Sequence, residues 1–250
     1  MEKLKKVINT KKFNIYMLIL IIFVILLITV VISFRYNVKG EVNMPFYLSK
    51  ISVISSVEGI NNSEDKTSKW NIKVNQNNDI YIYIEKNHNY EKTETIQSIK
   101  LENFNIQQNS KIGEVKLLKP DSNFESVIFR NTTENQVDSI EYIGDMETSI
   151  KDLKISNQGG ILVFRYAINN LGNYISNDDV EINHYDLLKK LSIDNNDLKV
   201  KVSFDICINL TSGKSYKAPV NLELPIDDVV NNGVQSKEFT DLENIVFKRL

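Results

Sequence analysis

The sequence predicts an all-β domain behind one N-terminal membrane-spanning helix, and three observations lead to that fold class. An apolar run occupies residues 15–34, helical periodicity nearly disappears after it, and a period-two alternation of apolar and polar residues takes its place. The expected segments are a basic N-terminus 1–14, a helix 15–34, a linker 35–48 and two β-sandwich units, 49–135 and 136–250, the second with a short helical insertion near 183–197.

The helix is predicted from the run between Ile15 and Phe34, which contains no charged residue. About 20 residues, at ~1.5 Å per residue, cross a hydrocarbon core of about 30 Å, and a backbone in lipid satisfies its hydrogen bonds as a helix. A cleaved signal peptide is the alternative. The run is longer than a signal-peptide core, however, and the residues around Phe34 make a poor cleavage site. We therefore expect Ile15 to Phe34 to be retained in the lipid bilayer.

The charges that flank this run predict its orientation. Five lysines precede it, namely Lys3, Lys5, Lys6, Lys11 and Lys12. Only Arg35 and Lys39 follow it before Glu41. Because positive residues remain in the cytoplasm, this excess predicts a single-pass protein of the cytoplasmic membrane, with its N-terminus inside and its C-terminal domain outside.

Composition narrows the classes of partner. The chain has a formal charge of -2, and the first 14 residues and Arg35 are net positive, so the remainder carries about -7. This balance argues against nucleic acid or anionic lipid as the partner of the domain. The single cysteine, Cys207, cannot form an intramolecular disulfide and is expected to be a small buried apolar residue. A domain outside the cytoplasm without disulfides is typical of a bacterial surface.

Strands are predicted wherever β-branched and aromatic residues alternate between turn-forming residues. The segment Asp79–Glu85, with apolar residues on both faces, indicates a central strand. The other expected strands are 50–57, 70–74, 96–106, 114–118, 150–155, 161–168, 198–210, 216–224 and a last one near the C-terminus. Asn-Gln pairs at 75–76 and 157–158 are expected to form turns before the strongest strands.

The two halves of the domain show the same order of patterns. KISVISSVEG, KWNIKVNQNNDIYIYIEKNHNY, SIKLENFNI and GEVKLLKP in the first half correspond to DSIEYIGDME, KDLKISNQGGILVFRYAINNLGNY, KVSFDICINL and APVNLELP in the second. This order predicts a duplication: two similar immunoglobulin-like β-sandwich halves, or one fused sandwich. The second half adds a helical pattern after Asn183, which is expected to cap it. This insertion either covers a sheet edge or binds a partner.

A search for chemistry yields no catalytic, cofactor-binding or metal-binding residue. His88 and His184 lie far apart in expected loops and match no zinc spacing. The pair Gly159-Gly160 precedes a strand rather than a helix, which indicates a turn and not a phosphate site. Acidic clusters at 178–181 and 194–197 lack the spacing of a calcium-binding loop, and a loose calcium site stays open as an alternative. Trp70 is expected in the core.

The lysine-flanked anchor, KWNIKVNQNNDIYIYIEKN, GGILVFRYAIN, SFDICINL and the terminal VFKRL resemble a group of uncharacterised single-pass membrane-anchored proteins of clostridial-type bacteria. The resemblance spans most of the chain and implies an immunoglobulin-like β-sandwich ectodomain without a stated activity.

The leading functional expectation is a non-enzymatic binding or scaffolding protein of the bacterial cell envelope, with a protein or an envelope polymer as partner. The alternatives are a cell-envelope hydrolase, which would bring two carboxylates together in a cleft, and an accessory subunit of a membrane transport or assembly complex.

Overall fold

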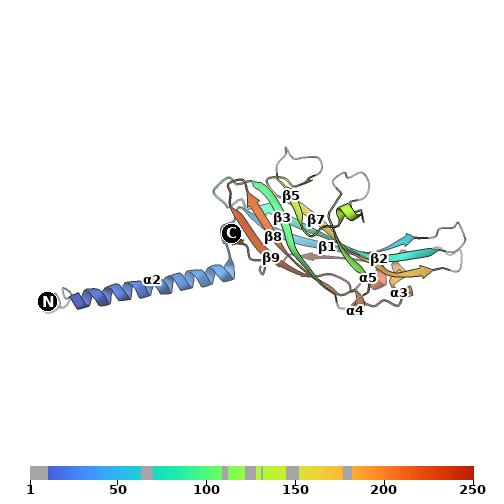
Figure 1. Ribbon diagram of the computed structural model, residues 1–250, viewed down its shortest axis with the longest axis horizontal. Helices are drawn as coiled ribbons and strands as arrows, with labels where there is room; N and C mark the ends of the chain where they lie inside the picture. The colour runs from blue at the N-terminus through green and yellow to red at the C-terminus, as the bar shows by residue number, and fades with distance from the viewer. Residues whose placement is uncertain are drawn as a thin grey trace. The chain divides into compact units, whose positions relative to one another are not determined.

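The computed structural model describes residues 11–62, 70–108, 112–121, 128–130, 132–144, 152–176 and 182–250. The chain divides into two compact units, Met1–Val42 and Asn43–Leu250 (Figure 1). The second unit, called the β domain below, contains every strand that the described residues form.

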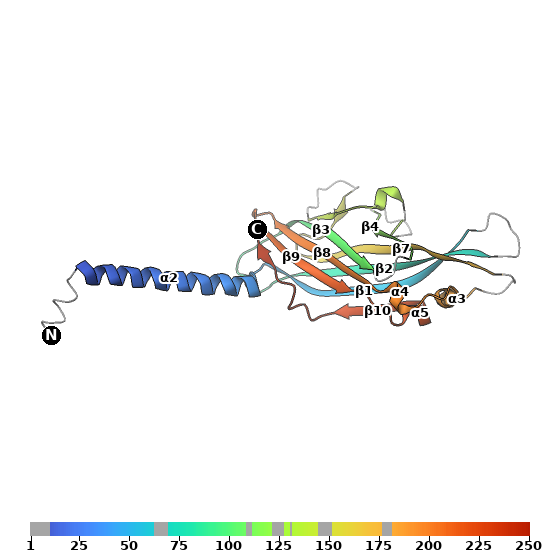
Figure 2. The same cartoon turned by 60° about the horizontal axis from the view of Figure 1, so that its bottom comes forward.

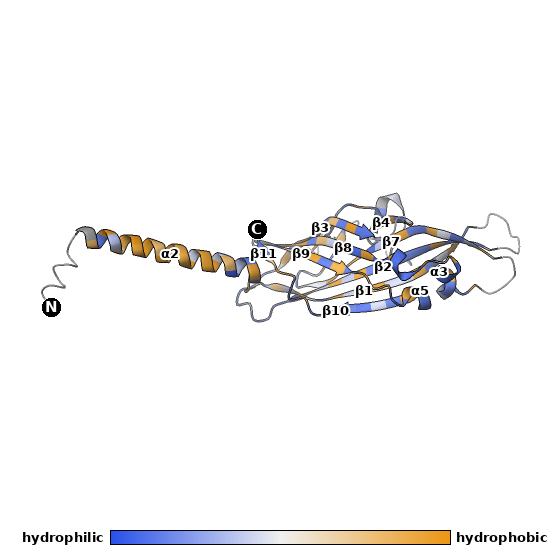
Figure 3. Cartoon of the chain, turned by 90° about the horizontal axis from the view of Figure 1, so that it is seen from below, coloured by the Kyte–Doolittle hydropathy of each residue, from blue (hydrophilic) through white to orange (hydrophobic). Residues whose placement is uncertain are grey.

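The first unit contains one long helix, α2 (Lys11–Lys39), which is longer than the expected 15–34 and includes part of the expected linker. Its segment Phe13–Lys39 is long and apolar enough to cross a membrane, and its side chains are exposed. Figure 3 shows hydrophobic residues along nearly the whole helix. A helix that is apolar all round, with no packed face, fits the membrane anchor that the sequence predicts.

The β domain contains two sheets. The five-stranded sheet A has the order β10-β1-β2-β7-β4, and the six-stranded sheet B has the order β11-β9-β8-β3-β5-β6. The strands of sheet A are β1 (Phe46–Asn61), β2 (Asn71–Lys86), β4 (Glu114–Leu118), β7 (Gly160–Ile175) and β10 (Val234–Phe239). Those of sheet B are β3 (Ile96–Gln108), β5 (Ile140–Ile143), β6 (Leu153–Lys154), β8 (Val200–Leu210), β9 (Ser215–Glu223) and β11 (Lys248–Arg249). All pairings are antiparallel except that of β5 with β6.

The two sheets share one hydrophobic core. Alternate residues of the long strands are buried, as a period of two requires when one face of a sheet is covered. Aromatic rings join the layers: Phe104 of β3 lies 5.4 Å from Phe164 of β7, and Phe204 of β8 lies 5.3 Å from Phe164, both as ring centroids. The outer face of each sheet is therefore the one turned away from these rings.

The expected units 49–135 and 136–250 are not separate bodies, because Asn43–Leu250 forms one compact unit. β2 of the first half pairs with β7 of the second, and β3 pairs with β8. The remaining counterparts lie in different sheets, because β1 is in sheet A and β5 in sheet B, while β4 is in sheet A and β9 in sheet B. The shared order of patterns is thus not a repeated structure, because similar strand patterns pack wherever an apolar face can be buried.

Short helices lie where the insertion was expected. They are η2 (His184–Asp186), α3 (Leu187–Lys190) and α4 (Asn195–Leu198). The Asn183 side chain accepts a hydrogen bond from the backbone N–H of Tyr185, as predicted. α3 contacts the inner face of β1, where a Cβ on Gly59 would lie 2.8 Å from Leu187 Cδ1. The insertion therefore covers part of the inner face of sheet A rather than a sheet edge, and Figure 2 shows it beside β1 and β2.

Some predicted strand and turn positions are correct and others are wrong. β2 is central, as expected, but it runs through the Asn-Gln pair at 75–76. The amides there bond within the sheet instead of making a turn: Asn75 Oδ1 accepts from the Asn170 N–H at 3.0 Å, at a register shift in the ladder. The turn at 157–158 and the C-terminal strand β11 are as predicted. β10, which follows the short helix α5 (Val229–Asn232), was missed because it is polar and lies at a sheet edge.

Candidate functional site

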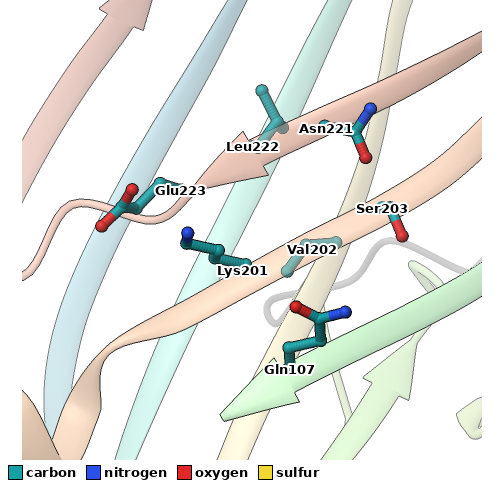
Figure 4. A pocket seen from close by; sticks show the side chains of 7 residues that line it. All are labelled: Gln107, Lys201, Val202, Ser203, Asn221, Leu222 and Glu223. Atoms are coloured by element: carbon teal, nitrogen blue, oxygen red, sulfur yellow. The ribbon is translucent and has the colours of Figure 1, made fainter. Parts of the chain in front are cut away.

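Among the described residues, a groove lies on each sheet of the β domain. The sheet B groove has a volume of about 270 Å³ and crosses the outer face of three strands. Its lining residues are Gln107, Lys201, Val202, Ser203, Asn221, Leu222 and Glu223. In Figure 4 the side chains of Gln107, Lys201 and Glu223 form a row from β3 through β8 to β9.

The sheet B groove is lined mainly by polar side chains, and its carboxylate, Glu223, already has a partner. Glu223 lies opposite Lys201 in the register and also accepts a hydrogen bond from Lys199 Nζ at 2.8 Å. This hydrogen bond lowers the pKa of Glu223. Ser203 lies opposite Asn221, and no aromatic side chain lines the groove. The groove offers hydrogen bonds, and its apolar lining side chains, Val202 and Leu222, are buried in the core.

Beside this groove, four charged residues of the outer face form an ion-pair network. Lys217 Nζ lies 3.0 Å from Glu102 Oε1 and 2.9 Å from Asp205 Oδ2, and Lys100 Nζ lies 3.0 Å from Glu102 Oε2. The hydrogen bonds from Lys100 and Lys217 lower the pKa of Glu102 to about 2. All four side chains are partly exposed, so the network neutralises the surface of sheet B without burying charge.

The sheet A groove lies where β2 ends and β7 begins, and it is the larger of the two, at about 520 Å³. Its lining residues are Tyr83, Ile84, Glu85, Lys86, His88, Gln158, Gly159, Gly160 and Ile161. Its volume is within the range of small-molecule sites, roughly 300–1,000 Å³.

The floor of the sheet A groove is apolar. Tyr83 on β2 lies directly opposite Ile161 on β7, and Ile161 is 49% exposed. Cross-strand neighbours have Cβ atoms about 5 Å apart, so the two side chains form one surface. Gly159 lines the groove beside this surface. Its φ of +114° favours glycine, and a Cβ there would lie 2.5 Å from the carbonyl oxygen of Ile84.

The rim of the groove holds a positioned carboxylate. Tyr47 Oη donates a hydrogen bond to Glu85 Oε2 at 2.8 Å. Ser49 lies at the register shift of β1 between Leu48 and Lys50, an irregularity that re-aims a side chain, and its Oγ donates to the carbonyl oxygen of Tyr83 at 3.4 Å. The neighbouring hydroxyl groups, that of Ser49 first and that of Tyr47 second, lower the pKa of Glu85 and keep it ionised at neutral pH.

Two lysines complete the surroundings of the groove. Lys86 Nζ donates to Gln158 Oε1 at 2.6 Å. Lys50 Nζ lies 4.6 Å from the centre of the Tyr83 ring and 2.7 Å from Glu238 Oε1. A cation over an aromatic ring is attracted by its negative face, so the protein's own lysine already occupies one face of Tyr83.

The edge of β7 next to the groove is occupied by a side chain of the other sheet. β4 pairs with β7 only from residue 165 to residue 169. Below that point, Tyr142 Oη of β5 donates to the carbonyl oxygen of Val163 at 2.5 Å and accepts from its N–H at 3.0 Å. Both backbone groups of Val163 therefore have a partner although β4 does not reach them.

The residues singled out from the sequence are not brought together. His88 lines the sheet A groove, whereas His184 begins η2. No group of three or more His, Cys, Asp or Glu side chains suited to a metal ion occurs among the described residues. The acidic cluster at 194–197 caps α4, with Asp194 accepting from the N–H groups of Asn196 and Asp197. The cluster at 178–181 lies outside the described residues.

Two further predictions from the sequence have clear outcomes. Cys207 is buried, as expected, but on the outer face of sheet B, where burial and the nearby Glu102 raise the pKa of its thiol to about 11. Such a thiol is inert at neutral pH. Trp70 is 43% exposed, so its expected place in the core is wrong. It precedes β2, where its carbonyl oxygen accepts from Ser176 at the end of the sheet.

The sheet A groove was missed at the level of sequence. Its signal is the alternation in DIYIYIE, which places Tyr81, Tyr83 and Glu85 on one face of a strand. That Gly159-Gly160 would lie beside this face depends on the pairing of β2 with β7.

No protein-family model matches the chain, and no curated protein matches it.

Proposed function

We propose that this chain is a single-pass protein of the bacterial cytoplasmic membrane whose β domain, outside the cytoplasm, binds a component of the cell envelope without chemical turnover. The sheet A groove is the proposed binding site. The observation that carries the proposal is the carboxylate of Glu85, which the Tyr47 hydroxyl holds beside the apolar surface of Tyr83 and Ile161. A few placed polar groups around an apolar floor are the general composition of a ligand site.

The membrane part of the proposal is supported by α2 and by the charges around it. The helix has the length and apolar character of a membrane span. The lysines that precede the apolar run favour a cytoplasmic N-terminus. The β domain after the helix has its own hydrophobic core, as a domain outside the membrane requires.

The composition of the grooves favours binding over hydrolysis. A glycoside hydrolase needs two carboxyl groups that face each other across the scissile bond. Among the residues that the structure describes, Glu85 is the one carboxylate that lines the sheet A groove, and Glu223 is the one that lines the sheet B groove. Glu223 is in addition bonded to Lys199.

A pair of reporter fusions tests the topology. We expect alkaline phosphatase fused after Leu250 to be active in intact bacteria and green fluorescent protein at the same position to be dark, because each folds productively on one side of the membrane only. The intact mass of the purified protein should include residues 1–34. A fluorescent C-terminal fusion, or a chain that has lost its apolar run, would contradict the proposed anchor.

Cross-linking in intact cells tests the binding role. A photoreactive residue in place of Gln158, at the rim of the sheet A groove, should capture an envelope protein or polymer. The same residue in place of Asn221, in the sheet B groove, is the matched control and should capture markedly less. Equal capture at both positions, or none at either, would overturn the proposed site.

A further inference from the structure

We infer that the sheet A groove binds a segment of an uncharged glycan, with a sugar ring over Tyr83 and Ile161 and its hydroxyls bonded to Glu85 and Gln158. This inference rests on the proposed function and adds the chemical class of the ligand.

The charges at the groove select against ionic ligands. Glu85 is ionised and faces the groove, so an anionic polymer would be repelled there, and the remainder of the chain after Arg35 carries about -7. A cationic ligand would meet Lys86 at the rim and Lys50 over the Tyr83 ring, the position that a cation would otherwise take. Glu85 and Lys86 balance each other, so the ligand that fits is neutral.

The shape of the groove suits a sugar ring. A pyranose has a face of C–H bonds and an edge of hydroxyl groups. The apolar surface of Tyr83 and Ile161 matches the face, because it removes C–H groups from water. Along β2, Tyr83 and Glu85 lie on the same side of the strand and about 7 Å apart. The carboxylate of Glu85 can therefore accept hydrogen bonds from the hydroxyls at the edge of a ring that rests on Tyr83.

A purely apolar ligand is excluded by the same rim. It would cover Glu85, Lys86 and Gln158 and offer them no hydrogen bonds, which is costly for charged groups. Hydroxyl groups both donate and accept, so they can serve the carboxylate, the amine and the amide at once.

The backbone around the groove disfavours an extended peptide. A peptide that adds to a sheet needs a strand edge with free N–H and C=O groups. β2 lies between β1 and β7. β7 is open below residue 165, and there Tyr142 takes both backbone groups of Val163. A glycan needs no such edge.

Titration calorimetry of the full-length protein in nonionic detergent tests the inference. The two neutral probes are chitohexaose and cellohexaose. The two charged probes are the chitosan hexamer, which lacks the acetyl groups of chitohexaose and is cationic, and hexagalacturonate, which is anionic. We expect at least one neutral hexamer to bind and the two charged hexamers to bind at least about tenfold more weakly, a difference of about 1.4 kcal/mol. Failure of both neutral hexamers to bind, or equal binding of a charged one, overturns the inference.

Variants assign the binding to the groove. Glu85→Gln keeps the shape of an exposed side chain and loses the charge-assisted hydrogen bond, so we expect about tenfold weaker binding. Tyr83→Ala should abolish binding and Tyr83→Phe should retain it, with the circular dichroism spectrum reporting that each variant is folded. Asn221→Ala in the sheet B groove is the control and should change nothing. Unchanged binding in Glu85→Gln and Tyr83→Ala places the ligand elsewhere and overturns the inference.

The cross-linking experiment separates this inference from the proposed function. If Gln158 captures an envelope protein while neither neutral hexamer binds, the glycan inference fails and the binding role remains. If nothing is captured and no hexamer binds, both fail.

Discussion

The outer faces of the two sheets satisfy their polar groups in different ways. On sheet B, lysines meet carboxylates: Lys217 bonds both Glu102 and Asp205, and Lys199 bonds Glu223. On sheet A, near the end of β2, the carboxylate of Glu85 is bonded instead by the Tyr47 hydroxyl, and an exposed isoleucine and a tyrosine lie beside it. The charges on the sheet B face pair with one another, whereas the sheet A face keeps a carboxylate acceptor and an apolar surface available.

The register of the strands causes this difference. Each sheet places residues of neighbouring strands directly opposite one another. On sheet B that pairing brings Lys201 to Glu223. On sheet A it brings Tyr47 to Glu85 and Ile161 to Tyr83. A few side chains at paired positions thus decide which face keeps a carboxylate acceptor beside an apolar surface, although both faces follow the same alternation.

Sheet A also has a covered region, which limits the open part of its outer face to one end. Arg165 on β7 forms two hydrogen bonds with Asp79 on β2, and its guanidinium lies 4.6 Å from the centre of the Phe129 ring. Phe129 packs with Leu118 and Ala167 in a small apolar cluster. The middle of the outer face is therefore covered, and the groove lies beyond this cover.

The largest effect on stability is expected for the ion pair between Arg165 and Asp79, because both side chains are partly buried. Arg165→Met should lower the free energy of unfolding by about 3 kcal/mol, because it leaves the partly buried carboxylate of Asp79 without its partner. Lys201→Met on sheet B is the control and should cost less than about 0.5 kcal/mol, since Lys199 still bonds Glu223. Urea unfolding of the full-length protein in detergent, followed by circular dichroism, measures both. Equal losses of unfolding free energy in the two variants would contradict the stated difference between the two faces.

The next effect concerns the side chain that links the two sheets. Tyr142→Phe should cost about 2 kcal/mol, because both backbone groups of Val163 lose their partner in a partly buried place. Tyr81→Phe is the matched control on the outer face of sheet A, since the Tyr81 hydroxyl makes no hydrogen bond with the described residues, and it should change the unfolding free energy by less than about 0.5 kcal/mol. The same unfolding measurement applies, and a loss below that of the control would mean that water replaces the Tyr142 hydroxyl.

Much of the fold follows from the sequence because its signals are local. The apolar run of α2 and the alternation of β2 are visible without a partner strand. The position of Asn183 as a cap is equally local. Pairing between distant strands is not local, and the sequence therefore does not show that β2 pairs with β7. Because β7 lies beyond residue 135, this pairing crosses the expected division of the domain.

The candidate site shows the same limit. The period-two pattern gives the shared face of Tyr83 and Glu85, but the sheet A groove forms only when β7 brings Gly159 and Ile161 to that face. The buried amides of β2 are a second example. Asn78 follows the pair at 75–76 that was expected to form a turn, and in the sheet its side chain accepts from Ser55 at 2.6 Å and donates to the carbonyl oxygen of Tyr166 at 3.2 Å. Polar residues in a strand are satisfied by partners that lie far away in sequence.

The smallest effect is a difference in pH dependence between the two faces. The pKa of Glu102 in the folded protein is lowered to about 2 from the usual 4.5. Its contribution to stability is therefore fully present above pH 4.5 and is lost as the pH falls from there towards 2, because the unfolded chain takes up the proton first. The pKa of Glu85 is also lowered, but by hydroxyl groups at an exposed site. The unfolding free energy should therefore fall less on acidification in Glu102→Gln than in the unmodified protein, by about 1 kcal/mol for the loss of the sheet B network. Glu85→Gln should have a smaller effect on this fall.

Unfolding free energies of the two variants and the unmodified protein between pH 7 and pH 2 measure this difference, and the other carboxylates cancel because all three proteins contain them. If Glu85→Gln flattened the curve as much as Glu102→Gln, the hydroxyl groups of Tyr47 and Ser49 would stabilise the folded carboxylate as strongly as two lysines do. Glu85 would then be a structural residue, and its charge would not be free for a ligand. If the two faces differ as described, Glu85→Gln should leave the pH dependence of the unfolding free energy nearly unchanged and should weaken glycan binding.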